Sequence, residues 1–472
     1  MGSGKVTDWQ GKHVTVAGLG VSGIPAAKAL HARGANVTVV NDGDDARARE
    51  QAAELEALGV TVRLGDGATL PEGTELVVTA PGWKPDKPLF AAARAAGLEI
   101  WGDVELAWRL RGPDAAPWLA ITGTNGKTTT TQMLASILKA AGLRTAAVGN
   151  IGVSLLDAVL GDEQYDVLAV ELSSYQLHWA PSLRAHSAAV LNLAPDHLDW
   201  HGSMEAYAAD KGRIYEGNRV ACVYNVADKA TEDLVREADV EEGCRAVGFT
   251  LGAPAPSQLG VVDGILVDRA FVENRHKNAQ ELAEISDVNP PAPHNIANAL
   301  AAAALARAFG VPPKAVRDGL RAFTPDAHRI AHVADVDGVA YVDDSKATNT
   351  HAAEASLAAY ESIVWIAGGL AKGASFDELV AKSAKRLRAV VLIGADRALI
   401  REALARHAPE VPVVDLDRTD TGAMLQAVTE AKRLAQPGDT VLLAPACASM
   451  DMFTNYNKRG DAFAEAVREL GS

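Results

Sequence analysis

The sequence predicts an α/β protein of three domains, each built around a mainly parallel sheet with Rossmann-like or P-loop-type topology. A length of 472 residues suggests about three domains, at roughly 150 residues per domain. Short β-branched runs alternate with helical segments along the whole chain, which is typical of parallel sheets covered by helices. We expect domains at residues 1–113, 114–325 and 326–472.

Composition excludes several classes of protein. The chain has 60 acidic and 45 basic residues, a net charge of -15 and a pI near 5.3, so neither nucleic acid nor an anionic membrane is an expected partner. Cys222, Cys244 and Cys447 show no metal-binding or disulfide spacing. No signal peptide or membrane span is encoded. We therefore expect a cytoplasmic protein that acts as a monomer.

The N-terminal segment predicts a β-α-β unit with a glycine turn. Strands are expected at 13–17 and 36–40, with a helix at 24–33 between them. Gly18-Leu-Gly-Val-Ser-Gly23 joins the first strand to the helix, and Asp42 ends the second strand. Backbone amides at such a turn can hold a pyrophosphate. The motif does not separate a nicotinamide cofactor from another diphosphate, or either one from an unliganded tight turn.

Further elements follow the same alternation, with a linker at 111–117. Residues 251–293 are rich in Gly, Pro and polar residues and predict surface loops or a small hairpin. Strands are expected at 75–79, 98–101, 118–121, 166–171, 339–342, 363–367, 389–393 and 440–443. Helices are expected at 88–96, 204–214, 296–308 and 397–407, from Thr350, and from Asp461 to the C-terminus.

Thr122-Gly-Thr-Asn-Gly-Lys-Thr-Thr129 lies between a predicted strand and an amphipathic helix, as a triphosphate-binding loop does. Lys127 would reach the β- and γ-phosphates, and Thr128 would meet Mg²⁺. Ile121 stands where a standard P-loop has its first glycine, so this loop is a shorter variant. The alternative is a glycine turn with a solvated lysine.

Several polar residues follow predicted strands at the carboxyl edge, where ligands gather in parallel sheets. Glu171 ends a buried-type strand and can hold Mg²⁺ or simply leave the strand into solvent. His197 and Lys211 have no chemical role that the residues alone establish. Asn295 and Asn298 can meet a purine edge or cap a helix. In the third segment, three loops predict a small polar pocket; they contain Asp344, Lys346 and Thr348, then Lys372, then Ser449.

Taken together, these motifs resemble those of the Mur ligases over nearly the whole chain. Residues 122–129, 171–177 and 294–298 match the superfamily, which includes the folylpolyglutamate synthases. Residues 344–349 and 445–451 resemble the D-glutamate-adding branch of the family. The first of these loops replaces the aspartate-tyrosine-alanine-histidine sequence of the diaminopimelate- or lysine-adding branch, and the arginine motif of that branch has no match.

The resemblance implies two nucleotide sites. The glycine turn would bind UDP rather than NAD, and the implied substrate contacts are Gly18, Leu19, Gly20, Val21, Ser22, Gly23, Asp42, Gly82, Asn150 and His197. ATP would contact Gly123, Thr124, Asn125, Gly126, Lys127, Thr128, Thr129, Asn295, Asn298, Arg329 and Asp344.

The resemblance also implies metal and amino-acid sites. Two Mg²⁺ ions would be held by Thr128, Glu171, His197 and Lys211, with Lys211 carbamylated. D-glutamate would be held by Thr348, Lys372, Ser449 and Tyr456, where Tyr456 departs from the pattern if phenylalanine is usual. The implied catalytic residues are Lys127, Glu171, His197, Lys211 and Lys346.

The implied activity is ATP-dependent addition of D-glutamate to UDP-N-acetylmuramoyl-L-alanine through an acyl phosphate. Three alternatives stay open on the sequence. One is an NAD-dependent oxidoreductase that uses residues 18–23 and Asp42. Another is a non-catalytic, ATP-gated interaction protein. The third is a different amide ligase with the same ATPase core, such as a folylpolyglutamate synthase.

Overall fold

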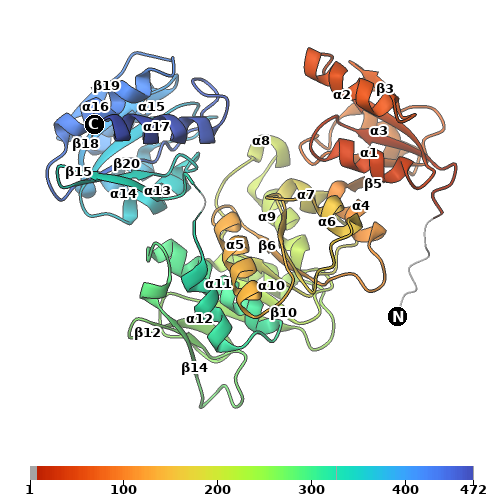
Figure 1. Cartoon of the computed structure of the whole chain (residues 1–472), viewed down its shortest axis with the longest axis horizontal. Coiled ribbons are helices and arrows are strands. Elements are labelled where there is room, and N and C mark those ends of the chain that lie inside the picture. The colour runs from red at the N-terminus through yellow and green to blue at the C-terminus, as the bar shows by residue number, and fades with distance from the viewer. Residues whose placement is uncertain (1–7, 326, 471–472) are drawn as a thin grey trace. The chain divides into compact units, whose positions relative to one another are not determined.

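A computed structural model describes residues 8–325 and 327–470 (Figure 1). Three separate sheets, of five, nine and six strands, run through the described residues, and helices cover their faces. This arrangement confirms the predicted three-domain α/β class. The chain divides into two compact units, residues 1–288 with 296–323, and residues 289–295 with 324–472. The first unit contains the first two sheets, and the second unit contains the third.

The first sheet is parallel throughout, in the order β3-β2-β1-β4-β5. Its strands are β1 (His13–Ala17), β2 (Asn36–Asn41), β3 (Thr61–Leu64), β4 (Leu76–Thr79) and β5 (Glu99–Gly102). Because alternate strand residues face opposite sides, two apolar layers form. One layer packs against α1 (Gly23–His31) and α2 (Ala46–Glu56), and the other against α3 (Pro88–Ala95).

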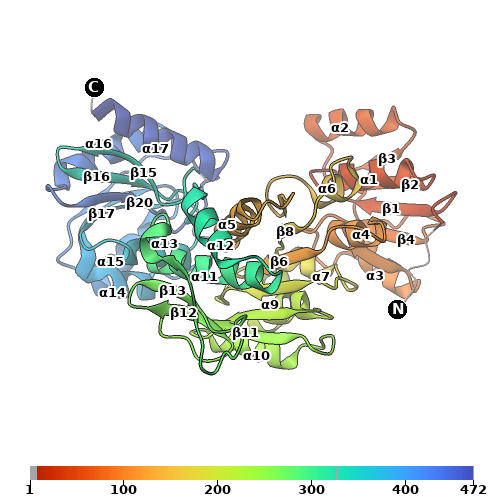
Figure 2. The same cartoon turned by 60° about the horizontal axis from the view of Figure 1, so that its bottom comes forward.

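The second sheet has the order β14-β13-β12-β11-β10-β9-β6-β8-β7. Its parallel part consists of β6 (Trp118–Thr122), β7 (Ala147–Gly149), β8 (Leu168–Glu171), β9 (Ser187–Val190), β10 (Ala221–Asn225), β11 (Arg245–Phe249) and β12 (Gln258–Val262). The helices α5 (Lys127–Ala140), α11 (Pro293–Ala308) and α12 (Pro313–Ala322) pack on one face (Figure 2). Shorter segments pack on the other face, including α4 (Asp103–Leu110), α6 (Leu155–Leu160) and α7 (Ser174–His178).

Residues 251–293 contribute more regular structure than the predicted loops or small hairpin. They supply β12 (Gln258–Val262), β13 (Ile265–Asp268) and β14 (Gln280–Glu284), and β13 runs antiparallel to both of the others. Asp263 and Gly264 join β12 to β13, with φ of +49° and +78°. Two successive positive φ angles are typical of a type I′ hairpin turn, for which Asp-Gly is a favoured sequence. The segment therefore extends the central sheet.

The third sheet has the order β15-β16-β20-β17-β18-β19, in which only β15 is antiparallel. Its strands are β15 (Ala331–Val336), β16 (Val339–Asp343), β17 (Ile363–Gly368), β18 (Leu387–Ile393), β19 (Val413–Asp415) and β20 (Thr440–Leu443). One face packs against α13 (Thr350–Ala358), α14 (Asp377–Ser383) and α15 (Arg397–His407). The other packs against α16 (Ala423–Leu434) and α17 (Tyr456–Leu470).

The predicted elements lie within a few residues of the observed ones, with one clear correction at the C-terminal end. The terminal helix α17 begins at Tyr456, five residues before the predicted Asp461. The antiparallel strand β15 was not expected. The domain boundaries stay predictions, and residue 326 lies outside the described residues. Within residues 8–325 and 327–470, no helix has the length and apolar character needed to cross a membrane.

Candidate active site

The glycine turn after β1 is held by close backbone packing. The Gly18 amide donates to the Val40 carbonyl at 2.8 Å, and the Leu19 amide donates to the Asn41 side chain at 3.1 Å. A Cβ on Gly23 would lie 1.9 Å from the Gly18 carbonyl oxygen, so only glycine fits where α1 begins. The turn therefore brings the start of α1 against the end of β1, as a pyrophosphate site requires.

The other predicted UDP contacts lie in different local settings. Asp42 forms an ion pair with Lys87 at 2.6 Å. The Gly82 carbonyl accepts a hydrogen bond from the Trp200 indole at 3.3 Å. Ser22 donates to the buried Asp103 carboxylate at 3.0 Å. Val21 is 87% exposed, which leaves the tip of the turn open.

The phosphate loop spans the end of β6 and the start of α5. Lys127 is the first residue of α5, and its Nζ donates to the carbonyls of Gly123 at 2.9 Å and Thr124 at 2.8 Å. The ammonium group therefore lies over the loop backbone. Thr128 and Thr129 are buried in the first turn of the helix, where free amides and the helix dipole favour an anion.

Two residues from other segments of the chain hold this loop through hydrogen bonds, and the sequence predicted a role for neither of them. The Asn192 side chain accepts from the Asn125 amide at 2.8 Å and donates to the Asn125 carbonyl at 3.0 Å. The Tyr207 hydroxyl forms a hydrogen bond of 3.0 Å with the Thr124 hydroxyl. The partners are 67 and 83 positions apart, so no local motif predicts either contact.

Glu171 is a buried carboxylate at the carboxyl end of β8. Asn150 donates its side-chain N–H to Glu171 Oε1 at 2.8 Å and its backbone N–H to the Glu171 carbonyl at 2.9 Å. Oε2 is buried and has no hydrogen-bond partner among the described residues. Burying an unpaired carboxylate oxygen is unfavourable, so this atom is suited to a bound cation.

Lys211 is 2% exposed and lies on helix α9 (Met204–Gly212). Its Nζ donates to the Gly123 carbonyl at 2.8 Å and is 3.4 Å from the Thr122 hydroxyl. Burial lowers the pKa of Lys211 well below its ordinary value, and the positive charge of Lys127 acts in the same direction. A neutral amine is therefore favoured beside the phosphate loop.

His197 lies between β9 and α9, directly before the short helix α8 (Leu198–His201). Burial lowers its pKa, Asp196 opposes this effect, and the positive charges of Lys127 and Lys211 support it. A neutral imidazole can serve as a metal ligand. Its ring lies 4.8 Å from the ring of Tyr175, within the predicted 171–177 motif.

The two predicted amides occupy the first turns of α11. Asn298 lies against the phosphate loop, because a Cβ on Gly126 would lie 2.4 Å from its side-chain oxygen. Asn295 donates to the Pro290 carbonyl at 3.3 Å. Since α11 begins at Pro293, neither amide is at the N-cap position.

In the second unit, three predicted loops meet at the carboxyl edge of the third sheet. The Ala446 amide donates to the Ala347 carbonyl at 2.9 Å, which joins the loops that hold Thr348 and Ser449. The amides of Leu370 and Ala448 each donate to the other residue's carbonyl at 2.9 Å. These two hydrogen bonds join the loop that holds Lys372 to the loop that holds Ser449. Ser449 is buried, whereas Lys372 is exposed and has φ of +50°.

Asp344 and Lys346 lie in the first of these loops. Asp344 accepts hydrogen bonds from Ser356 and from the backbone amide of Ile330, which follows Arg329. Burial raises the pKa of Asp344 to about 6. The Lys346 ammonium lies 3.9 Å from the centre of the Tyr456 ring, a distance typical of a cation–π contact.

A buried arginine that sequence reasoning missed joins the same loops to α17. Arg459 is 1% exposed and donates to the hydroxyl and carbonyl of Ser345, at 3.0 and 2.9 Å, and to the Cys447 carbonyl at 3.1 Å. Burial lowers its pKa to about 10. Because its partners are 12 and 114 positions away, its role is visible only in the fold.

The structure thus brings together two groups of predicted residues. Within the first unit, Lys127, Lys211, Glu171 and Asn298 surround or adjoin the phosphate loop. Within the second unit, the predicted D-glutamate residues lie on neighbouring loops or, for Tyr456, at the start of α17.

The predicted metal set is not a conventional cluster of acids, histidines and cysteines. The described part of the chain holds no group of three or more such side chains placed to bind one ion. Of the predicted ligands, only Glu171 and His197 belong to those residue types, while Thr128 supplies a hydroxyl. Lys211 would become an oxygen ligand only as a carbamate. The unpaired oxygen of Glu171 fits a cation at this position.

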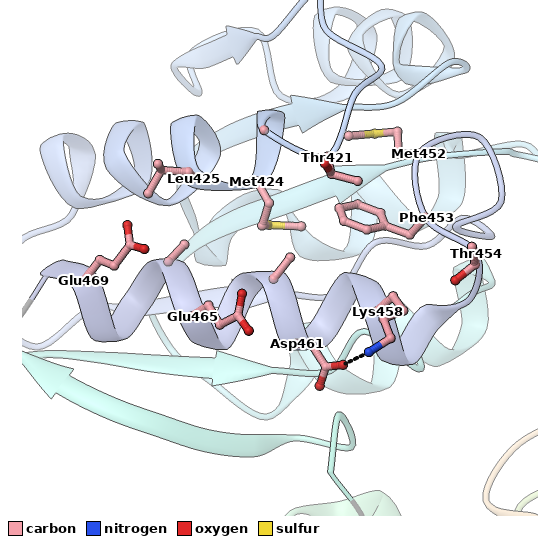
Figure 3. Close-up of a pocket in the computed structure, with 13 residues that line it drawn as sticks. Thr421, Met424, Leu425, Met452, Phe453, Thr454, Lys458, Asp461, Glu465 and Glu469 are labelled. Carbon is pink, nitrogen blue, oxygen red and sulfur yellow. Dashed lines mark hydrogen bonds and ion pairs between the residues drawn. The ribbon is translucent and has the colours of Figure 1, made fainter.

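A pocket of about 600 Å³ lies in the second unit, between α16 and α17 (Figure 3). Met424 and Phe453 point into it, and Glu465 lies on the α17 side. Lys458 and Asp461 form an ion pair at its edge, at 3.2 Å. None of the predicted site residues lines it.

Comparison with known families defines the class of protein. Residues 12–102 match the MurD-like N-terminal domain of Mur ligases, residues 121–306 match the Mur ligase middle domain, and residues 328–447 match the Mur ligase glutamate ligase domain. The chain belongs to the Mur ligase family.

Curated relatives narrow this similarity to one branch of the family. The chain is 88% identical over 467 residues to the UDP-N-acetylmuramoylalanine--D-glutamate ligase of Streptomyces avermitilis, covering 99% of this chain and 100% of the relative. It is 87% identical over 469 residues to the ligase of the same name from Streptomyces coelicolor, with the same coverage. Among solved structures, MurF ligase from Thermotoga maritima in complex with ADP shares the fold, with a TM-score of 0.56 at 14% identity, covering 99% of this chain and 97% of that one.

Proposed function

We propose that this protein is an ATP-dependent ligase that joins D-glutamate to UDP-N-acetylmuramoyl-L-alanine, a step in peptidoglycan precursor synthesis. The observation that carries the proposal is full-length identity of 88% to a relative named for this reaction. We place the reaction in the bacterial cytoplasm, where ATP is available. We propose that the protein acts as a monomer.

The reaction must activate a carboxylate, which is a poor electrophile because it is anionic and lacks a good leaving group. The terminal L-alanine carboxylate attacks the γ-phosphorus of ATP, the bond to the bridging oxygen of ADP breaks, and an acyl phosphate forms. The neutral amine of D-glutamate then attacks the acyl carbon. The tetrahedral intermediate loses a proton from the attacking nitrogen, and the carbon–oxygen bond to phosphate breaks, which gives the amide and releases inorganic phosphate.

The first step brings two anions together, so it needs concentrated positive charge. Lys127 lies on the phosphate loop, and its contacts with two carbonyls would be exchanged for γ-phosphate oxygens when ATP binds. The amides at the start of α5 would hold the β-phosphate. A local site of this kind explains how an acidic protein can bind a highly anionic nucleotide.

We assign two Mg²⁺ ions, one to Thr128 and Glu171 and a second to the neighbourhood of His197 and a carbamylated Lys211. The unpaired Oε2 of Glu171 and the buried amine of Lys211 support this assignment. Bound Mg²⁺ would neutralise phosphate charge and polarise the γ-phosphoryl group. A neutral amine captures CO₂ and loses a proton to give an anionic oxygen ligand, and burial of Lys211 favours that neutral form.

We assign the remaining ligand contacts from the resemblance of their motifs to those of the family. The glycine turn at residues 18–23 and Asn150 would hold the UDP substrate, while Asn295, Asn298, Arg329 and Asp344 would hold the adenosine part of ATP. Thr348, Lys372, Ser449 and Tyr456 would hold D-glutamate, with Lys346 beside Tyr456.

The test is phosphate release from ATP and Mg²⁺ in the presence of UDP-N-acetylmuramoyl-L-alanine. D-glutamate, L-glutamate and no amino acid are compared, and a parallel series contains excess EDTA. We expect release only with the nucleotide sugar, D-glutamate and Mg²⁺ together, and amide product in equal amount.

Two results would contradict the proposal. Equal release with L-glutamate would remove the assigned specificity. Nucleotide binding without release in any combination would favour the non-catalytic alternative, and a substrate screen with folates would then test the related amide ligases.

A further inference from the structure

A carboxylate, two imidazoles and a guanidinium form a closed cluster beside the phosphate loop. Asp210 lies 2.9 Å from His178 Nδ1, 2.9 Å from His201 Nδ1 and 3.2 Å from Arg213 Nε. We call these four residues the Asp210 cluster. The side chain of Asp210 is 7% exposed and that of His201 is fully buried. The predicted site and the proposed mechanism give no role to any of them.

The hydrogen-bond directions make Asp210 the centre of this cluster. An ionised carboxylate only accepts, so both imidazoles donate their Nδ1–H to it. His201 Nε2 forms a second hydrogen bond, of 2.9 Å, with the Ser174 hydroxyl. Arg213 also donates to the His178 carbonyl at 3.1 Å. Loss of Asp210 would leave two buried or half-buried ring N–H groups without their shared acceptor, which is costly.

The cluster joins three helices, each of which carries or closely follows a proposed metal ligand. His178 ends α7, which begins three residues after Glu171. His201 ends α8, which begins directly after His197. Asp210 lies on α9, immediately before Lys211. Lys211 is therefore on one of the helices that the cluster holds, His197 directly precedes another, and Glu171 lies three residues before the third.

Helix geometry gives Asp210 control over the direction of Lys211. Successive residues on an α-helix point about 100° apart, so fixing one side chain fixes the rotation of the next. Asp210 is held by α7 and α8, while Lys211 points to the phosphate loop and donates to the Gly123 carbonyl at 2.8 Å. A small rotation of α9 would move the amine away from that loop.

We propose that Asp210 is a positioning residue, which through His178 and His201 locks α9 so that the Lys211 amine faces the phosphate loop. The consequence for catalysis rests on the proposed function, because it requires Lys211 as a carbamate. The direction in which the Lys211 amine points does not depend on that function.

The test uses Asp210→Ala, Asp210→Asn and a control variant, Glu205→Ala, which changes an exposed residue on the same helix. Each protein is equilibrated with ¹³C-bicarbonate, and the carbamate resonance assigned by its absence in Lys211→Ala is measured by NMR. Steady-state kcat, and KM for the UDP substrate, are measured in parallel.

We expect Asp210→Ala to reduce the carbamate signal and to lower kcat by about 10- to 100-fold, the usual effect of losing a group that orients a metal ligand. KM for the UDP substrate should stay unchanged. Asp210→Asn keeps the side-chain shape and one acceptor oxygen, so it should restore part of both losses. Glu205→Ala should match the wild type.

A wild-type carbamate signal in Asp210→Ala would overturn the proposal, whatever its kcat, and so would the absence of a signal in the wild type at saturating bicarbonate. If Asp210→Ala does not fold, Asp210→Asn alone decides in the same way. Failure of the wild type to release phosphate with D-glutamate would instead contradict the proposed function, and the dependence of the carbamate on Asp210 would still be measured.

Discussion

Lys127 and Lys211 donate hydrogen bonds to the same backbone oxygen, that of Gly123, at 2.9 and 2.8 Å. Two ammonium groups on one acceptor repel each other, and only Lys211 is almost fully buried. The lysine that loses its proton more readily is therefore Lys211. Lys127 is only half-buried and lies on the phosphate loop, so the two lysines are suited to different roles.

Lys211→Ala should abolish most activity, and short carboxylic acids should restore part of it. The substitution leaves a buried space beside Gly123, into which formate or acetate can place the oxygen that the carbamate would supply. Phosphate release is measured over a range of acid concentrations. Chloride salts at matched ionic strength serve as the control. An absence of rescue by every acid would count against the carbamate.

Lys127→Ala should lower turnover by about 10² to 10³, the scale of losing one preorganised contact to developing charge. The defect should lie mainly in kcat, because the contact with the γ-phosphate strengthens as charge shifts in the transition state. Lys139→Ala, which changes an exposed lysine at the other end of α5, is the matched control. Turnover within threefold of the wild type would remove Lys127 from the mechanism.

Much of the fold is encoded locally and was predictable for that reason. Strand β1, helix α15 and strand β20 have the bounds predicted from periodicity. The loops or small hairpin predicted for residues 251–293 understate the meander after β11, although Asp263-Gly264 is a strong turn signal, because its strands are only four or five residues long. Strand β15 was also missed.

The residues that hold the site loops through hydrogen bonds were not predictable, because their partners are distant in sequence. Asn192 holds Asn125 across 67 positions, and Arg459 holds Ser345 across 114. The roles proposed for Lys211 and Tyr456 came from family resemblance, and no local pattern distinguishes either from a solvated side chain. The fold adds a physical reason for Lys211, namely its burial beside the phosphate loop.

Gly23→Ala should destabilise the protein by about 1–3 kcal/mol, because the new methyl group would lie 1.9 Å from the Gly18 carbonyl oxygen. The start of α1 would have to move away from β1. Gly20→Ala is the matched control, since a Cβ there meets no atom within 4 Å. Thermal unfolding of both variants is compared with the wild type. Equal midpoints for the two variants would show that the turn tolerates displacement.

Asp344→Asn should stabilise the second unit more at pH 7.5 than at pH 4.5. Burial raises the pKa of Asp344 from 3.8 to about 6, so the folded state holds this proton more tightly than the unfolded state does. Its contribution to stability is greatest below pH 3.8 and is lost as the pH rises through about 6. At about 1.4 kcal/mol per pH unit, the full loss is about 3 kcal/mol, of which about 2 kcal/mol falls between the two test conditions.

The asparagine removes this cost without removing the local hydrogen bonds. Its oxygen can accept from the Ile330 amide, and its N–H can donate to the Ser356 hydroxyl, which can then donate to the Ala352 carbonyl 3.1 Å away. Trp365 is the single tryptophan in residues 324–472, so fluorine NMR of fluorotryptophan-labelled protein follows unfolding of this unit alone. Glu410→Gln, at an exposed position of the same unit, controls for a general change in charge. A stability difference between Asp344→Asn and the wild type that stays constant from pH 4.5 to 7.5, or that shrinks as the pH rises, would contradict the raised pKa.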